Sequence, residues 1–286
     1  MRVAVTGAAG FVGAAIVAHL RAHGHAVTPL TRAEWDVTVG PFAGDHAFDV
    51  VVHAAALVDD RASIGTAMLA NRIGTRNVVA SFPDARIVHI STSSVYDAFV
   101  PSVRVTEREP LPARFLSSYS ESKAAAEGEL PAGSVILRPH AVYGPGDRTL
   151  LPRILGGIRG HRLPLPAGAR VSHTLTHIDN LVLAVELALD GPAGTYNVGD
   201  DTDVLLSAVL TEFLARRGRA DVSITSIPYP LAYRAAALAE RLSRRPRLTR
   251  YAVSQLGVER TLDLTAARER LGYRPGPTTL AGAEEW

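Results

Sequence analysis

The chain opens with Met1-Arg2-Val3-Ala4-Val5-Thr6-Gly7-Ala8-Ala9-Gly10-Phe11-Val12-Gly13, and apolar residues at helical spacing follow. The apolar, β-branched run over residues 1–5 predicts a buried strand. Gly7 permits a tight turn, Gly10 lets the backbone approach a pyrophosphate, and Gly13 allows close packing of helix on strand. The N-terminus of the helix would face the phosphates with its free N–H groups and positive dipole end. This glycine triplet, placed between a strand and a helix, predicts a dinucleotide-binding turn.

The end of the expected second strand, His25-Ala-Val-Thr-Pro-Leu30, is where the adenosine ribose of a dinucleotide would lie. An acid there favours NAD, because it accepts hydrogen bonds from both ribose hydroxyls, whereas an arginine pairs with the 2′-phosphate of NADP. The chain has Thr31-Arg32 at this point. Arg32 therefore favours NADP, with NAD still possible and a solvated loop cation as the alternative for Arg32. We expect Asp36 and Val37 to border the adenine.

Two further buried strands are predicted, over Asp49–Ala56 and Arg86–Ile90, with a helix over Asn71–Ala80 between them. The first of these strands ends in Ala54-Ala55-Ala56, whose small side chains leave room for a flat cofactor or simply pack closely. The alternation of strands and helices up to about Tyr143 predicts a doubly wound parallel α/β sheet.

The sequence contains a single lysine, Lys123, and the other 29 of its 30 basic Lys and Arg residues are arginines. Lys123 follows Tyr119 by four residues, so both side chains lie on one face of a helix. An ammonium there favours the phenolate form of a tyrosine whose ordinary pKa is about 10. It can also hydrogen-bond a cofactor ribose, which a planar guanidinium does less readily. The pair predicts a tyrosine that exchanges a proton with an alcohol or a ketone, with a solvated surface pair as the alternative.

A hydroxyl-rich stretch, Ser91-Thr92-Ser93-Ser94-Val95-Tyr96, follows the strand that ends at Ile90, and Leu137-Arg-Pro-His-Ala-Val-Tyr-Gly-Pro-Gly-Asp147 comes later. Together with the glycine turn, the alanine strand end and Tyr119-x-x-x-Lys123, these motifs resemble the extended short-chain dehydrogenase/reductase superfamily. That superfamily also holds the NAD-dependent sugar epimerases and dehydratases. The resemblance covers nearly the whole chain, and the occurrence of all these motifs in the family's order argues against coincidence.

The resemblance implies roles for individual residues. Thr92, four positions before Tyr96, would be the catalytic hydroxyl that holds the substrate oxygen beside Tyr119, with Lys123 completing the catalytic set. Ser93, Ser94, His140 and His173 would face the substrate, although His140 has the alternative of contacting the cofactor through its backbone alone. The predicted cofactor-binding residues are Gly7, Gly10, Phe11, Val12, Gly13, Arg32, Asp36, Val37, Ala54, Ala55, Ala56, Tyr119, Lys123, Pro139, His140 and Val142.

The substrate class is narrowed by departures from the sugar-nucleotide enzymes. The dehydratases carry an Asp-Glu pair where this chain has Ser93-Ser94, and His173 stands where an arginine grips the sugar-nucleotide pyrophosphate. The C-terminal stretches over residues 248–256, 261–268 and 271–275 are similar to the 3β-hydroxysteroid dehydrogenase-like branch, which includes bacterial reductases of 2-alkyl-3-keto acids.

We therefore expect an NAD(P)-dependent oxidoreductase that interconverts a ketone and a secondary alcohol. A nucleotide-sugar epimerase is the alternative. A non-catalytic dinucleotide sensor is the second alternative, but it would not need a proton relay. The resemblance also implies a Rossmann domain over residues 1–145 and a small substrate-binding lobe over residues 146–286, with a segment near 171–200 rejoining the sheet.

Composition agrees with an ordinary globular protein, since 47% of residues are hydrophobic and 20% are charged. The net charge of +2 and the lack of a recognition motif argue against nucleic acid as a partner, and the absence of cysteine excludes disulfides and thiolate chemistry. Without a signal peptide or a membrane span, we expect a cytoplasmic enzyme with a small-molecule substrate. We expect no metal, reading His19, His23 and His25 as an exposed helix end, and a homodimer is possible through Ala124–Ala126.

Overall fold

Six parallel strands form the central sheet of the structure, a computed structural model that describes residues 1–243 and 245–286. The strands lie in the order β11-β6-β4-β3-β1-β2, and neighbouring strands are parallel throughout. Their bounds are β1 Arg2–Thr6, β2 Ala26–Leu30, β3 Val50–His53, β4 Arg86–Ile90, β6 Val135–Pro139 and β11 Gly194–Val198. The chain runs outward from β1 to β2 and then returns to β3 on the other side of β1. This confirms the doubly wound sheet, and its strand order reverses at β1, where such sheets bind their ligands.

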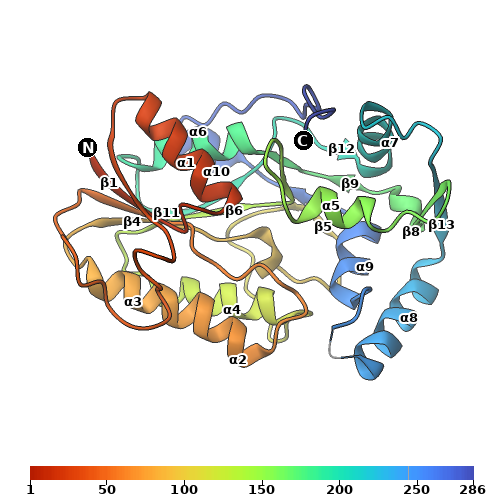
Figure 1. Cartoon of the computed structure of the whole chain (residues 1–286), viewed down its shortest axis with the longest axis horizontal. Coiled ribbons are helices and arrows are strands. Elements are labelled where there is room, and N and C mark those ends of the chain that lie inside the picture. Colours follow the sequence, from red (N-terminus) through yellow and green to blue (C-terminus); the bar gives the residue numbers. More distant parts are fainter. Residues whose placement is uncertain (244) are drawn as a thin grey trace.

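Helices cover both faces of the sheet (Figure 1). One layer holds α1 Phe11–Ala22, α6 Ile178–Ala188 and α10 Thr265–Arg270; the other holds α2 Ile64–Ala67, the π-helical segment η1 Met68–Ile73, α3 Gly74–Ser81 and α4 Ser118–Glu127. Within β1, Val3 and Val5 pack toward the first layer and Ala4 toward the second. Because side chains alternate along a strand and both faces are covered by helices, the inner strands β1, β3 and β4 are mostly apolar.

A smaller part of the structure lies beyond the carboxyl ends of these strands. It contains a four-stranded sheet in the order β12-β9-β14-β5, the pairs β8 with β13 and β7 with β10, and a core around Leu163, Leu210 and Phe213. The strands are β5 Ser102–Val105, β7 Val142–Tyr143, β8 Arg162–Pro166, β9 Ser172–His173, β10 Thr176–His177, β12 Val204–Leu205, β13 Ser223–Ile227 and β14 Arg260–Leu262. The helices are α5 Leu150–Leu155, α7 Leu206–Arg216, α8 Tyr229–Leu242 and α9 Arg250–Gly257, with short 3-10 turns η2 Ser93–Val95 and η3 Ala167–Ala169.

The two parts exchange segments along the chain. β11 comes after most of the smaller part yet pairs with β6 at the edge of the large sheet, and β5 precedes α4 yet pairs with β14 in the small sheet. The domain boundary at residue 145 stays a prediction.

Ala124 and Ala126 of α4 are buried within the chain itself, so they are not a free surface for packing a second copy. The homodimer stays a prediction that would need another surface. Among the described residues, none of the helices has both the length and the apolar character needed to cross a bilayer.

Candidate active site

The glycine turn between β1 and α1 has the shape that a bound pyrophosphate requires. Gly7 has φ +69°, and a Cβ there would lie 2.7 Å from the backbone of Ala55. A Cβ on Gly13 would lie 2.2 Å from the Gly7 carbonyl oxygen. The close approach of the backbone therefore leaves no room for a side chain at either position. Gly10 caps α1 without a side-chain hydrogen bond, and no acid lies in the first turn. The first N–H groups of α1 therefore remain available to an anion, which fits a dinucleotide.

The loop after β2 carries the residues expected around the adenosine. The Arg32 side chain is 84% exposed, and its Nε donates to Asp36 Oδ2 at 2.9 Å. Asp36 also accepts hydrogen bonds from the backbone N–H and hydroxyl of Thr38, and these bonds, with Arg32, lower the pKa of its carboxyl. Val37 is buried against Gly74. Asp36 is thus engaged in ordering the loop, while most of the Arg32 side chain faces solvent.

Thr92, Tyr119 and Lys123 come together at the carboxyl end of β4. Tyr119 and Lys123 lie one turn apart on α4, whose first turn is capped by Ser117 accepting from Ser120 N at 3.1 Å. Thr92 follows β4 and caps the η2 turn, where its Oγ1 accepts from Ser94 N at 3.1 Å. The Thr92 side chain lies close enough to Tyr119 to act on the pKa of its hydroxyl as a hydrogen-bond donor.

Burial controls the ionisation of the tyrosine and the lysine. Tyr119 is 9% exposed, and burial raises its pKa above the ordinary value although the hydrogen bond with Thr92 acts in the opposite direction. Lys123 is 2% exposed, and burial lowers its pKa to about 8 against the opposing charge of Glu127. Its Nζ donates to Ile90 O at 2.7 Å and lies 3.0 Å from His89 Nε2. Strand β4 therefore holds the lysine in place. The pKa of Tyr119 was expected to be lowered, but in this structure burial raises it.

His140 and His173, both expected to face the substrate, form a buried chain behind Ser93. Ser93 Oγ lies 2.9 Å from His140 Nδ1, and His140 Nε2 lies 3.0 Å from His173 Nδ1. Burial, with a smaller contribution from Arg260, lowers the pKa of His173 to about 3, and burial also lowers that of His140 well below its ordinary value. Both rings are therefore neutral near pH 7. The His140 ring is hydrogen-bonded to Ser93 and His173 within the protein, and its role toward the substrate or the cofactor stays a prediction.

Tyr251 of α9 is a site residue that sequence reasoning did not select. Its hydroxyl lies 2.8 Å from Ser94 Oγ, and its ring meets that of Tyr119 edge to face, with centroids 6.5 Å apart and planes at 77°. Ser94 and Tyr251 are 157 residues apart in the sequence, and no motif connects them.

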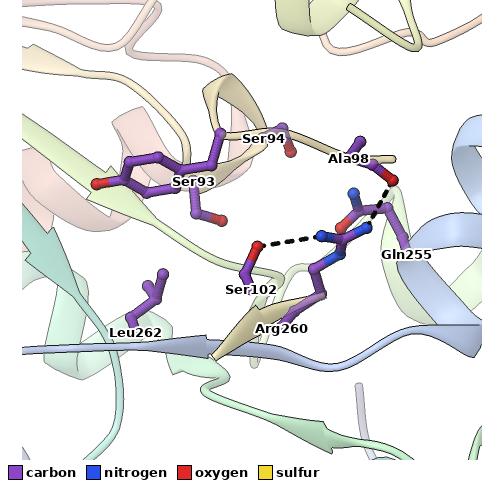
Figure 2. A pocket seen from close by; sticks show the side chains of 8 residues that line it. Ser93, Ser94, Ala98, Ser102, Gln255, Arg260 and Leu262 are labelled. Carbon is purple, nitrogen blue, oxygen red and sulfur yellow. Dashed lines mark hydrogen bonds between the residues drawn. The ribbon is translucent and has the colours of Figure 1, made fainter. Parts of the chain in front are cut away.

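A small cavity of about 10 Å³ lies behind the Ser93–Ser94 turn, between it and β14 (Figure 2). Arg260 lines this cavity and donates hydrogen bonds to the carbonyls of Asp97, Ala98 and Val100 and to two serine hydroxyls. Among the described residues, no carboxylate forms an ion pair with its guanidinium, so the backbone carbonyls solvate the buried charge. Arg260 fixes the segment that follows the catalytic turn.

A possible set of metal ligands lies apart from these residues. His19 and His23 of α1 and Glu186 of α6 place their ligand atoms within 4.8 Å of one another, at the far end of α1 from the glycine turn. His19 Nε2 lies 2.6 Å from Glu186 Oε2, which accounts for the cluster as an ion pair when the imidazole is protonated. The expectation of no metal stays a prediction.

The sequence matches a known protein family. The model of the NAD dependent epimerase/dehydratase family matches residues 3–199. The 4-hydroxy-2-methyl-3-oxo-4-farnesyl-3,4-dihydroquinoline-1-oxide ketoreductase of Stigmatella aurantiaca is 34% identical, with 99% of this chain and 95% of that protein covered. The 2-alkyl-3-oxoalkanoate reductase of Stenotrophomonas maltophilia is 30% identical, with 96% and 95% covered.

Solved structures share the fold. The dTDP-4-dehydrorhamnose reductase of Bacillus anthracis in complex with NADP matches with a TM-score of 0.73 and 21% identity, over 99% of this chain and 97% of that one. The resemblance read from the sequence is confirmed. The chain therefore belongs to the NAD-dependent epimerase/dehydratase family of extended short-chain dehydrogenases/reductases, and is an NAD(P)-dependent oxidoreductase of the ketone–alcohol type.

Proposed function

We propose that this enzyme uses NADP(H) to reduce a ketone that carries a second oxygen nearby, and that Thr92, Tyr119 and Lys123 perform the proton chemistry. The convergence of these three side chains at one strand end is the observation that carries the proposal. Two ketone reductases to which the chain is similar are named for such compounds, one a 4-hydroxy-3-oxo compound and the other a 3-oxoalkanoate.

Thr92 would orient the substrate. Its oxygen accepts the N–H of Ser94, and its hydroxyl hydrogen, which is directed at Tyr119, would turn to a ketone oxygen bound between the two side chains. Tyr119 would donate the proton that turns this oxygen into an alcohol, and its raised pKa keeps it protonated until the reaction needs it. A bound nicotinamide supplies the hydride for the carbonyl carbon.

Lys123 would stabilise the phenolate that Tyr119 becomes after giving up its proton. With a pKa of about 8, its ammonium is mostly charged at neutral pH, and strand β4 holds it in place. The glycine turn would hold the pyrophosphate, and residues 54–56 and 139–142 would border the nicotinamide half of the cofactor.

The preference for NADP rests on Arg32, whose largely exposed guanidinium lies beside the loop after β2. Arg32 would exchange its ion pair with Asp36 for an ion pair with the 2′-phosphate, which carries more negative charge than a carboxylate. A cytoplasmic location, expected from the sequence, belongs to the same proposal.

The nucleotide-sugar alternative is disfavoured by His173. A sugar-nucleotide pyrophosphate needs a cation at this position, but the buried imidazole is neutral and bound to His140.

Calorimetric titration of the purified enzyme with NADPH, NADH, UDP and dTDP tests the proposal. Binding of NADPH in preference to NADH, without affinity for either nucleoside diphosphate, is the expected result. Copurified NAD together with binding of UDP or dTDP would instead establish a sugar-nucleotide enzyme and would leave Arg32 without the proposed role.

A further inference from the structure

The turn after β4 presents two hydroxyl pairs, and the proposed chemistry uses one of them. Thr92 pairs with Tyr119, and two residues later Ser94 pairs with Tyr251 at 2.8 Å. The two tyrosine rings are in edge-to-face contact, which brings the second pair next to the first. A substrate held at Thr92 and Tyr119 therefore has the second pair as its neighbour.

The Tyr251 hydroxyl has the properties of a substrate contact. Burial and the neighbouring Tyr119 raise its pKa, so it stays a neutral hydrogen-bond donor. Its residue is partly exposed while Ser94 is buried, and among the described residues Ser94 is its one hydrogen-bond partner. A phenol can accept from Ser94 and donate to an incoming oxygen at the same time.

The position of Tyr251 is fixed by contacts at the start of α9. Thr249 caps this helix by accepting from Ala252 N at 3.0 Å, and its hydroxyl donates to Asp60 from the loop after β3. Asp60 also accepts from Arg153 of α5 at 2.7 Å, and its side chain is 4% exposed. These bonds tie α9 to the large sheet, so that Tyr251 is held against the catalytic turn.

The small cavity behind the Ser93–Ser94 turn is bounded on its far side by Arg260. Figure 2 shows Ser93 and Ser94 on one side of the small cavity and Arg260 on the other, with Gln255 of α9 beside the guanidinium. Arg260 donates to the Asp97 carbonyl, three residues after Ser94, and so fixes the chain that leaves the turn.

We propose that Ser94 and Tyr251 form a subsite for a second substrate oxygen, a hydroxyl or carbonyl oxygen on a carbon one or two bonds from the ketone carbon. Tyr251 donates to this oxygen while Thr92 and Tyr119 hold the ketone. The inference rests on the proposed function, since it places the second oxygen relative to a ketone bound at Thr92 and Tyr119.

The test compares pairs of substrates in NADPH-dependent reduction. Each pair consists of a 3-oxo ester or an α-hydroxy ketone and the ketone of the same chain length without the second oxygen, over several chain lengths. The wild-type enzyme should prefer the oxygenated member. Tyr251→Phe should reduce the ratio of the two kcat/KM values roughly tenfold, because one hydrogen bond to the substrate is lost.

A matched control separates recognition from stability. Tyr233→Phe removes the same hydroxyl from α8 in the same part of the chain and should leave the ratio unchanged. The ratio does not respond to the folded fraction, since both substrates report on the same enzyme molecules. Ser94→Ala should lower the ratio in the same direction as Tyr251→Phe.

The outcomes separate the subsite from the proposed function. Loss of all reduction in Tyr119→Phe, with an unchanged ratio in Tyr251→Phe, would overturn the subsite alone. Equal wild-type efficiency on both members of every pair would do the same. Reduction that survives in Tyr119→Phe, or no reduction of any ketone by the wild type, would overturn the proposed function and the subsite with it.

Discussion

Gly13 offers the sharpest test of how the cofactor turn is built. In Gly13→Ala the new Cβ would start 2.2 Å from the Gly7 carbonyl oxygen, while real Cβ contacts are essentially never under 3.0 Å. The backbone must therefore move by at least 0.8 Å, the difference between these distances, because no side-chain rotation can relieve a contact between Cβ and backbone. Strain of this kind costs about 1–3 kcal/mol, which lowers Tm by roughly 2–6 °C in a chain of this size.

Two other glycines provide a graded comparison. A Cβ on Gly10 would lie 3.2 Å from the same carbonyl oxygen, and one on Gly65 of α2 would meet nothing within 4 Å. Gly10→Ala should weaken NADPH binding with little change in Tm, because Gly10 is exposed where the pyrophosphate approaches. Gly65→Ala should lower neither quantity, since alanine is favoured over glycine in a helix.

The assay combines thermal unfolding with titration of NADPH followed by fluorescence. Gly13→Ala should have a lower Tm and a lower affinity for NADPH than the wild type. A loss of about 0.5 kcal/mol in unfolding free energy corresponds to about 1 °C in Tm. The reasoning would be refuted if Gly13→Ala melted within about 1 °C of the wild type and bound NADPH normally.

Three further results are expected. Tyr119→Phe should abolish turnover while calorimetry shows NADPH affinity largely intact; a near-wild-type rate would remove Tyr119 from its proposed role. Lys123 has a pKa of about 8, so its amino group is charged below that pH and neutral above it. The rate of ketone reduction, followed by NADPH absorbance, should therefore fall as pH rises through 8. A flat profile to pH about 10 would contradict the role of this charge. Glu127→Gln should lower the unfolding free energy measured by chemical denaturation by about 3–5 kcal/mol, because it leaves the buried Arg138 guanidinium without its ion pair. Glu121→Gln, at an exposed position on the same helix, is the control. Equal stability of the two variants would argue against a buried ion pair.

Local patterns made much of the fold predictable. The glycine turn, the apolar strands and the spacing of Tyr119 and Lys123 are each contained within about 15 residues, so periodicity and residue type suffice to read them. The sheet and the family were predicted on this basis and are confirmed. The individual roles of the site residues stay predictions, to be tested by the substitutions described above.

Long-range contacts were beyond the reach of these patterns. Tyr251 meets Ser94 across 157 residues, and Thr249 meets Asp60 across 189, and neither pair has a signal in the spacing of residues. His140 and His173 were predicted to face the substrate, and that role stays a prediction; their mutual hydrogen bond depends on how β6 and β9 are placed by the fold. A side chain's partner is decided by tertiary packing, which a single sequence encodes only indirectly.

The late arrival of β11 has a consequence for how the protein is made. Until residue 198 has left the ribosome, β6 is an unprotected sheet edge with unpaired N–H and C=O groups, which is a template for association with other chains. A fragment that ends at residue 145 should therefore aggregate when expressed alone. Chimeras that exchange the substrate-binding half at that point should fail for the same reason, whereas grafts that carry residues 194–198 with the first half keep β6 paired with its native edge strand.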